Sequence, residues 1–230
     1  MSQLDILAVL ICFLAWAVFS WATDREHGFL PVSLTQIMNV HRTAWLENSL
    51  RRDLRMIDTS IMAGLQQGTG FFASTALLAI GGCFALLGAT DQVLGVLSDI
   101  PFGVPADRQA FELKVAGLIV IFCFSFFKFG WSYRLFNYCQ ILVGAIPMVG
   151  DVETDRNHAD HCVKRAAAIN ILAGKHFNAG FRAIFISLGY IGWFIGPVVF
   201  LFTTLLVMLV LIRRQYFSAA RKALMSGVDM

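Results

Sequence analysis

The densest group of charged residues lies at positions 51–58, where the sequence reads Arg-Arg-Asp-Leu-Arg-Met-Ile-Asp. On a continuous helix, opposite charges that are three or four residues apart become neighbours and stabilise the helix weakly. The residues with these spacings are Glu47, Arg51, Arg55 and Asp58. Two interpretations remain open. The group is either a solvated or interfacial face whose arginines contact lipid phosphates, or a buried polar network between helices.

We expect Asp58 to belong to a network inside the protein, because an unpaired carboxylate at a lipid boundary is costly. Its expected partners are Arg55, Lys128 and Arg134. Lys128 is the one charge that lies more than two positions inside a predicted membrane span, where it either extends to the interface or lines a vestibule. The buried-network interpretation gives these candidates for a polar network or pore vestibule: Arg52, Asp53, Arg55, Asp58, Gln66, Gln67, Lys128, Arg134, His176, Asn178 and Arg182.

The segment 158–162, His-Ala-Asp-His-Cys, contains residue types that bind zinc. A structural zinc site usually needs four such ligands in pairs, and no second pair follows, so a solvated helix start is favoured and no metal or cofactor is expected. His176, Asn178 and Arg182 could coordinate an anion or hold two helices together. The sequence has no Gly-rich phosphate loop, no nucleophile motif and no basic stripe suited to nucleic acid, so an enzyme is not expected.

Long uncharged runs must position these residues, and they indicate membrane spans. The chain of 230 residues is 57% hydrophobic and 14% charged, and residues 183–212 carry no charge. A helix of about 20 apolar residues crosses the roughly 30 Å hydrocarbon core and satisfies its own backbone. The sequence therefore predicts an all-α, polytopic membrane helical bundle, a single integral membrane domain over 1–230 with about four transmembrane helices at 4–22, 70–90, 113–133 and 192–212.

Helical patterns continue beyond the predicted spans. Ser33 and Gln36 have the spacing of a capping box, which predicts a helix that begins at about residue 34 and continues, straight or bent, to the second span. Cytoplasmic helical segments are expected at about 34–69 and 134–191. The second, third and fourth membrane helices would then extend into the cytoplasm.

The distribution of Lys and Arg predicts an N-terminus outside the inner (plasma) membrane and, with four spans, a C-terminus outside as well. Arg213 and Arg214 count against this arrangement, because they directly follow the last span. A hairpin at Gly196 and Pro197 would return the tail to the inside, but arms of about fifteen residues are short for full crossings. Residues 181–212 therefore form either one long kinked helix or a hairpin, and we retain four spans.

Three parts of the chain carry a resemblance to a known family. They are Arg-Asp-Leu-Arg-Met-Ile-Asp at 52–58 leading to Phe-Phe-Ala-Ser-Thr at 71–75, Lys-Phe-Gly-Trp-Ser-Tyr-Arg at 128–134 with Phe-Asn-Tyr at 136–138, and His-Phe-Asn-Ala-Gly-Phe-Arg-Ala at 176–183. In this order they resemble an uncharacterised family of multi-pass membrane proteins of bacteria and plants, known by the domain-of-unknown-function number 599. The resemblance implies a four-span membrane protein and brings no reaction or substrate.

Three functions are compatible with these features. The first is a homo-oligomeric channel or transporter-like protein for a small solute or ion, in which long helices surround a cytoplasmic vestibule. The second is a non-catalytic scaffold or accessory subunit of a membrane complex. The third, a membrane enzyme using His158, His161 or His176, lacks a paired nucleophile or base. The expected partners are the lipid bilayer, further copies of the chain and an unidentified membrane protein, with no nucleic acid.

Overall fold

The computed structural model describes residues 2–24, 31–98, 107–152 and 154–225. These residues form helices and no β-strand, which confirms the predicted all-α bundle. The helices are α1 (Gln3–Asp24), α2 (Leu34–Asn48), η1 (Ser49–Arg51), α3 (Met56–Gly88), α4 (Thr90–Ser98), α5 (Arg108–Gly144), α6 (Val149–Val152), α7 (Arg156–Ile191), η2 (Gly192–Phe194), α8 (Pro197–Tyr216) and α9 (Ala219–Met225).

Four segments are long and apolar enough to cross a membrane, as the sequence predicts. They are α1, α3, α5 and Pro197–Met225, which contains α8 and α9. The helices α3, α5 and α7 have 33, 37 and 36 residues. At 1.5 Å per residue each is roughly 50 Å long, whereas a hydrocarbon core is about 30 Å thick. These three helices are therefore longer than a membrane requires.

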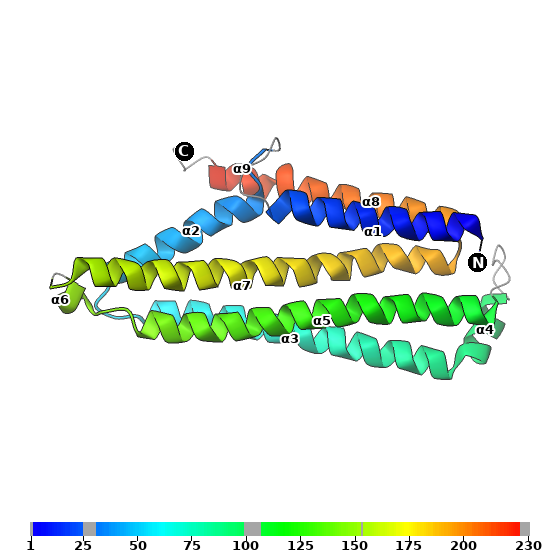
Figure 1. Cartoon of the computed structure of the whole chain (residues 1–230), viewed down its shortest axis with the longest axis horizontal. Coiled ribbons are helices and arrows are strands. Elements are labelled where there is room, and N and C mark those ends of the chain that lie inside the picture. Colours follow the sequence, from blue (N-terminus) through cyan, green and yellow to red (C-terminus); the bar gives the residue numbers. More distant parts are fainter. Residues whose placement is uncertain (1, 25–30, 99–106, 153, 226–230) are drawn as a thin grey trace.

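The helices are arranged in layers on either side of α7 (Figure 1). On one side α7 packs against α5, and α5 packs in turn against α3. On the other side α1 and α8 pack on each other and on α7, along the half of α7 that leads to its C-terminal end. Helix α2 continues from the ends of α1 and α8 across α7 toward the opposite end of the bundle.

The chain reverses direction between α7 and α8. The turn η2 follows α7, and Pro197 begins α8. Proline has no backbone N–H, but the N–H groups of the first helical turn have no partner within the helix, so α8 loses no hydrogen bond there. Helix α8 then runs back along α7, and the Thr203 hydroxyl donates to the carbonyl oxygen of Gly189 at 2.7 Å. Of the two alternatives for residues 181–212, the structure therefore contains the hairpin, and the last predicted span begins with a turn.

The helix expected between residue 34 and the second span is interrupted. Its start is as predicted, because the Gln36 N–H donates to Ser33 Oγ at 3.3 Å and the Ser33 N–H donates to Gln36 Oε1 at 2.7 Å. Helix α2 then ends at Asn48, and Arg52 has an extended backbone with φ −104° and ψ 128° before α3 begins at Met56. The predicted ladder of charges along one continuous helix is therefore wrong.

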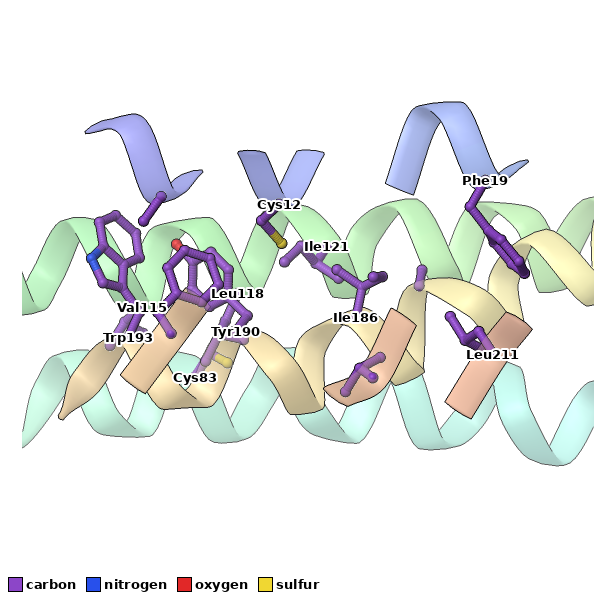
Figure 2. Close-up of a cluster of buried hydrophobic side chains, with 14 of the residues drawn as sticks. Cys12, Phe19, Cys83, Val115, Leu118, Ile121, Ile186, Tyr190, Trp193 and Leu211 are labelled. Atoms are coloured by element: carbon purple, nitrogen blue, oxygen red, sulfur yellow. The ribbon is translucent and has the colours of Figure 1, made fainter. Parts of the chain in front are cut away.

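Two clusters of buried hydrophobic side chains hold the bundle together. The first lies between α1, α5, α7 and α8 and includes Cys12, Ile121 and Tyr190 (Figure 2). The second lies between α2, α5 and α7 and includes Leu46 and Phe136. Because lipid tails are as apolar as these side chains, helices in a membrane associate mainly through close packing, and small residues at the contacts permit it.

Gly117 is such a contact, since a Cβ atom there would lie 1.9 Å from the Tyr190 hydroxyl oxygen. We predict that Gly117→Ala lowers stability by about 1–3 kcal/mol, the usual cost of overpacking, measured as thermal unfolding in detergent. Gly81→Ala is the matched control, because its Cβ would meet no atom within 4 Å. Adding Tyr190→Phe to Gly117→Ala should restore part of the loss. Equal stability of Gly117→Ala and Gly81→Ala would contradict this packing.

Candidate functional site

Asp58 is the most deeply buried charge of the predicted network. Its side chain is 0% exposed, and Oδ1 accepts hydrogen bonds from Trp45 Nε1 at 2.7 Å and from Arg52 Nη1. Its Oδ2 has no hydrogen-bond partner among the described residues. A network inside the protein therefore exists and contains Arg52 and Asp58, which were both predicted as members, but the partners of Asp58 differ from those expected. Arg52 and Trp45 stand where Arg55, Lys128 or Arg134 were predicted.

Arg55 is not paired with Asp58 and instead binds backbone carbonyls at the C-terminal end of α5. Its guanidinium donates to the carbonyl oxygens of Val143, Ile146 and Pro147. The last carbonyls of a helix lack partners within the helix and carry partial negative charge, so a cation is favourable there. This contact fixes the start of α3 to the end of α5, and it explains why Arg55 is not available to Asp58.

The remaining candidates do not form one continuous network. Gln66 Nε2 donates to Asn137 Oδ1 at 2.7 Å, which joins α3 to α5, whereas Asp53 and Gln67 are exposed. Lys128 Nζ lies 5.2 Å from the centre of the Phe124 ring. Arg134 Nε donates to Tyr138 Oη at 2.6 Å, and the His176 ring lies edge-on to Trp131. The Asp58 cluster, defined as Trp45, Arg52 and Asp58, therefore joins α2 to α3 and, among the described residues, shares no hydrogen bond with the other candidates.

A polar pocket lies elsewhere, between α1, α2, α7 and α8. It has a volume of about 320 Å³. Its lining consists of Gly174, of phenylalanine and other apolar side chains, and of a set of polar side chains. The polar side chains are Thr23, Thr35, Asn39, Arg42, Asn178, Arg182, Arg214 and Gln215. We call this the Arg182 pocket. Of the predicted site residues it brings together Asn178 and Arg182.

Arg182 is buried in the wall of this pocket, with a side chain that is 7% exposed. Its Nη2 donates to both carboxylate oxygens of Asp24, at 3.0 and 3.2 Å, and so ties α7 to the end of α1. Its Nε has no hydrogen-bond partner among the described residues, and neither has the buried hydroxyl of Thr23. Since buried polar atoms are nearly always satisfied, a water molecule or a ligand in the pocket would complete the hydrogen bonding of these two atoms.

Two further arginines line the pocket. Arg42 Nη1 donates to Asn170 Oδ1 at 2.5 Å. A Cβ atom on Gly174 would lie 3.1 Å from the Arg42 guanidinium carbon, so only glycine leaves this space free. Burial lowers the pKa of Arg42, and the nearby Cys139 thiol acts in the opposite direction, but a guanidinium stays protonated at neutral pH. Arg214 is exposed and lies over the ring of Phe185, 5.3 Å from its centre.

Thr35 joins three helices at the same pocket. Its hydroxyl oxygen accepts from Gln215 Nε2 at 2.8 Å and from Asn178 Nδ2 at 3.5 Å. Sequence reasoning missed Thr35, Arg42 and Arg214, because they come from helices whose contact was not predicted. The one available signal was the position of Arg214 directly after a span.

The segment 158–162 lies at the start of α7. Asp155 accepts a hydrogen bond from the His158 backbone N–H at 3.0 Å and caps the helix, as expected for an acidic helix start. Cys162 Sγ lies 3.6 Å from His158 Nε2. The part of the chain that the structure describes contains no group of three or more His, Cys, Asp or Glu side chains that could hold a metal ion.

A family model described as a protein of unknown function, DUF599, matches residues 7–220. No curated protein and no solved structure matches the chain.

For the Asp58 cluster we predict that Arg52→Met is more destabilising than Asp58→Asn. Breaking a buried pair costs about 3–5 kcal/mol, and the carboxylate left by Arg52→Met is fully buried. The variant that carries both substitutions should recover part of the loss. Lys128→Met and Arg134→Met are the controls and should cost only about 0–1 kcal/mol. Thermal unfolding in detergent measures all five variants, and a loss in either control as large as that in Arg52→Met would refute the assignment.

Proposed function

The chain belongs to the DUF599 family, and we propose that it is a multi-pass inner-membrane protein of transporter-like function that binds a small solute in the Arg182 pocket. The observation that carries this proposal is the pocket itself, which has unsatisfied buried polar atoms and is lined in part by α1 and α8, two helices that lie in segments apolar enough to cross a membrane. Polar groups within membrane helices usually face a solute path or a water-filled cavity. A volume of about 320 Å³ suits a small ligand.

The proposal includes a topology in which the N-terminus is outside and the C-terminus inside. The turn between α7 and α8 lies beside the start of α1, because Trp193 Nε1 donates to Asp5 Oδ1 at 2.8 Å, and beside the start of α5, because Lys114 Nζ donates to the Trp193 carbonyl at 2.8 Å. The other end of α8 lies beside the start of α2, where Gln215 contacts Thr35. Helices α1 and α8 thus run in parallel, from the same end of the bundle.

This arrangement requires five crossings. Helices α1, α3 and α5 make the first three crossings, so α5 ends inside. The turn between α7 and α8 lies outside, and the chain reaches it only if the C-terminal half of α7 also crosses the membrane. Helix α8 has 20 residues and is about 30 Å long, which removes the objection that the arms of a hairpin are too short. The proposed topology differs from the expectation that both ends lie outside. It places Arg213, Arg214, Arg221 and Lys222 inside, as the positive-inside rule favours.

A second candidate, a scaffold or a homo-oligomer, is favoured by one further observation. Apolar side chains around the start of α3 and the end of α5 are exposed, although they lie beyond the predicted spans. Leu54 is 72% exposed, Met56 75%, Ile57 55% and Ile141 69%. Large exposed apolar side chains beyond the spans are typical of a face that another protein covers. A further copy of the chain or another membrane protein would fit there.

We predict that Ser2→Cys and Ser218→Cys, each in a variant without other cysteines, react differently with a membrane-impermeant maleimide. In intact cells the cysteine at position 2 should be labelled, whereas the cysteine at position 218 should be labelled only after the membrane is permeabilised. The cysteine-free variant is the control. Labelling at position 218 in intact cells would rule out an inner C-terminus.

We predict that the protein in liposomes accelerates the entry of at least one member of a panel of labelled anionic, cationic and neutral solutes. Met38→Trp should slow this entry about tenfold, equivalent to 1.4 kcal/mol, because Met38 lines the rim of the Arg182 pocket. Met148→Trp is the matched control, since Met148 is also exposed but lies outside the residues that line the pocket. Equal entry in liposomes with and without the protein would contradict a transport function.

A further inference from the structure

We infer that the ligand of the Arg182 pocket is a dianionic oxyanion, either inorganic phosphate or the phosphate monoester headgroup of a lipid. This inference rests on the proposed function only for the location of the site. It adds the chemical class of the ligand, for which the charges, the free donors and the aromatic wall of the pocket each give an argument.

The charge of the pocket is the first argument. Arg42, Arg182 and Arg214 line it, and Asp24 is the one carboxylate paired with any of them among the described residues. Three guanidinium groups against one carboxylate leave an excess of about two positive charges, and a phosphate monoester carries about −1.5 to −2 at neutral pH. A neutral or cationic ligand would leave this excess in a partly desolvated site, which is unfavourable.

The free donors are the second argument. Arg182 uses Nη2 for Asp24, but its buried Nε faces no acceptor, and the Thr23 hydroxyl is equally unpartnered. An oxyanion offers several acceptor oxygens on one atom and can therefore satisfy both groups. Arginine presents its donors in a planar fork that suits phosphate oxygens, and such charge-assisted hydrogen bonds are the strong ones.

The composition of the wall is the third argument. Phe19, Phe177, Phe181 and Phe185 line the pocket together with its arginines. Phe19 also lines an apolar groove of about 490 Å³ between α1 and α8. A headgroup with an attached acyl chain would find apolar surface next to its charge, whereas free phosphate would use only the arginines. The experiment below therefore tests both sources of the same phosphate group.

Asp24 competes with the ligand for Arg182. Its carboxylate is 39% exposed and accepts both hydrogen bonds from Arg182 Nη2. Removing this charge leaves the guanidinium without a counter-ion and raises the positive excess. Asp24→Asn should therefore bind the ligand more tightly than the natural chain. If Asp24 served only to fix α1 to α7, its replacement would not strengthen ligand binding.

The test uses the full-length protein in phosphatidylcholine nanodiscs. One arm measures binding of labelled inorganic phosphate. The other measures, by native mass spectrometry, which lipid the protein retains when phosphatidic acid or phosphatidylglycerol is added, because the first has a monoester and the second a diester headgroup with one negative charge. We expect phosphate, phosphatidic acid or both to bind, and where phosphatidic acid binds we expect it to be retained over phosphatidylglycerol.

We expect Arg182→Gln and Arg214→Gln each to weaken this binding at least about tenfold, equivalent to 1.4 kcal/mol. Arg214 is exposed, so its variant keeps the test valid if Arg182→Gln does not fold. Arg134→Gln is the control, since Arg134 contacts Tyr138 and is not part of the pocket. Asp24→Asn should strengthen binding.

The inference is overturned if neither probe binds, if phosphatidylglycerol is retained as well as phosphatidic acid, or if both arginine variants bind as the natural chain does. Its failure is distinct from that of the proposed function. Solute entry that Met38→Trp slows, with no binding of either probe, would remove the phosphate assignment and leave transport in place. Binding of a probe without any solute entry would remove the transport function and leave the phosphate assignment in place.

Discussion

The desolvation of charged side chains between apolar helices is the constraint on which this structure depends. Moving a charge out of water costs several kcal/mol unless it is paired and hydrogen-bonded. Among the described residues, the two buried charged side chains each join two segments, Asp58 by its pair with Arg52 and Arg182 by its pair with Asp24, and the half-buried Arg55 binds the carbonyls at the end of α5. Apolar packing alone leaves long helices free to slide along one another in lipid, because the hydrophobic effect does not drive their contact there. The polar contacts fix which turn of one helix faces which turn of the next.

The sequence was sufficient for those elements whose signals are local. The uncharged runs located α1, α3 and α5, and the capping box at Ser33 located the start of α2. The break after α2 was not predictable, since the spacing of charges around Arg55 suits a continuous helix. The carbonyls that bind Arg55 lie about ninety residues further along the chain. A long-range contact of this kind outweighs the few tenths of a kcal/mol that a pair of charges on one helix contributes.

The hairpin between α7 and α8 remained one of two alternatives in the sequence for a related reason. Residues 183–212 carry no charge, and a turn within an apolar run gives no polar signal of its own. Gly189 and Gly192 are equally consistent with a face for helix packing within one long helix. They do serve in packing, because a Cβ atom added at either position would approach Thr203 or its backbone. The same hairpin explains why Asn178 and Arg182 could be named in advance, whereas Arg214 could not. Only after α8 folds back does Arg214 lie beside α7.

Helix α2 connects the two polar groups of the structure. Arg42 lines the Arg182 pocket, and Trp45, less than one turn further along α2, donates to the buried Asp58. The hydrogen bonds from Arg42 to Asn170 and from Trp45 to Asp58 therefore hold one turn of α2 against α7 and against α3. Through this turn of α2 the Asp58 cluster is connected to the pocket. Its buried charge holds α2 at a defined position against α3 and thus sets the position of the Arg42 guanidinium.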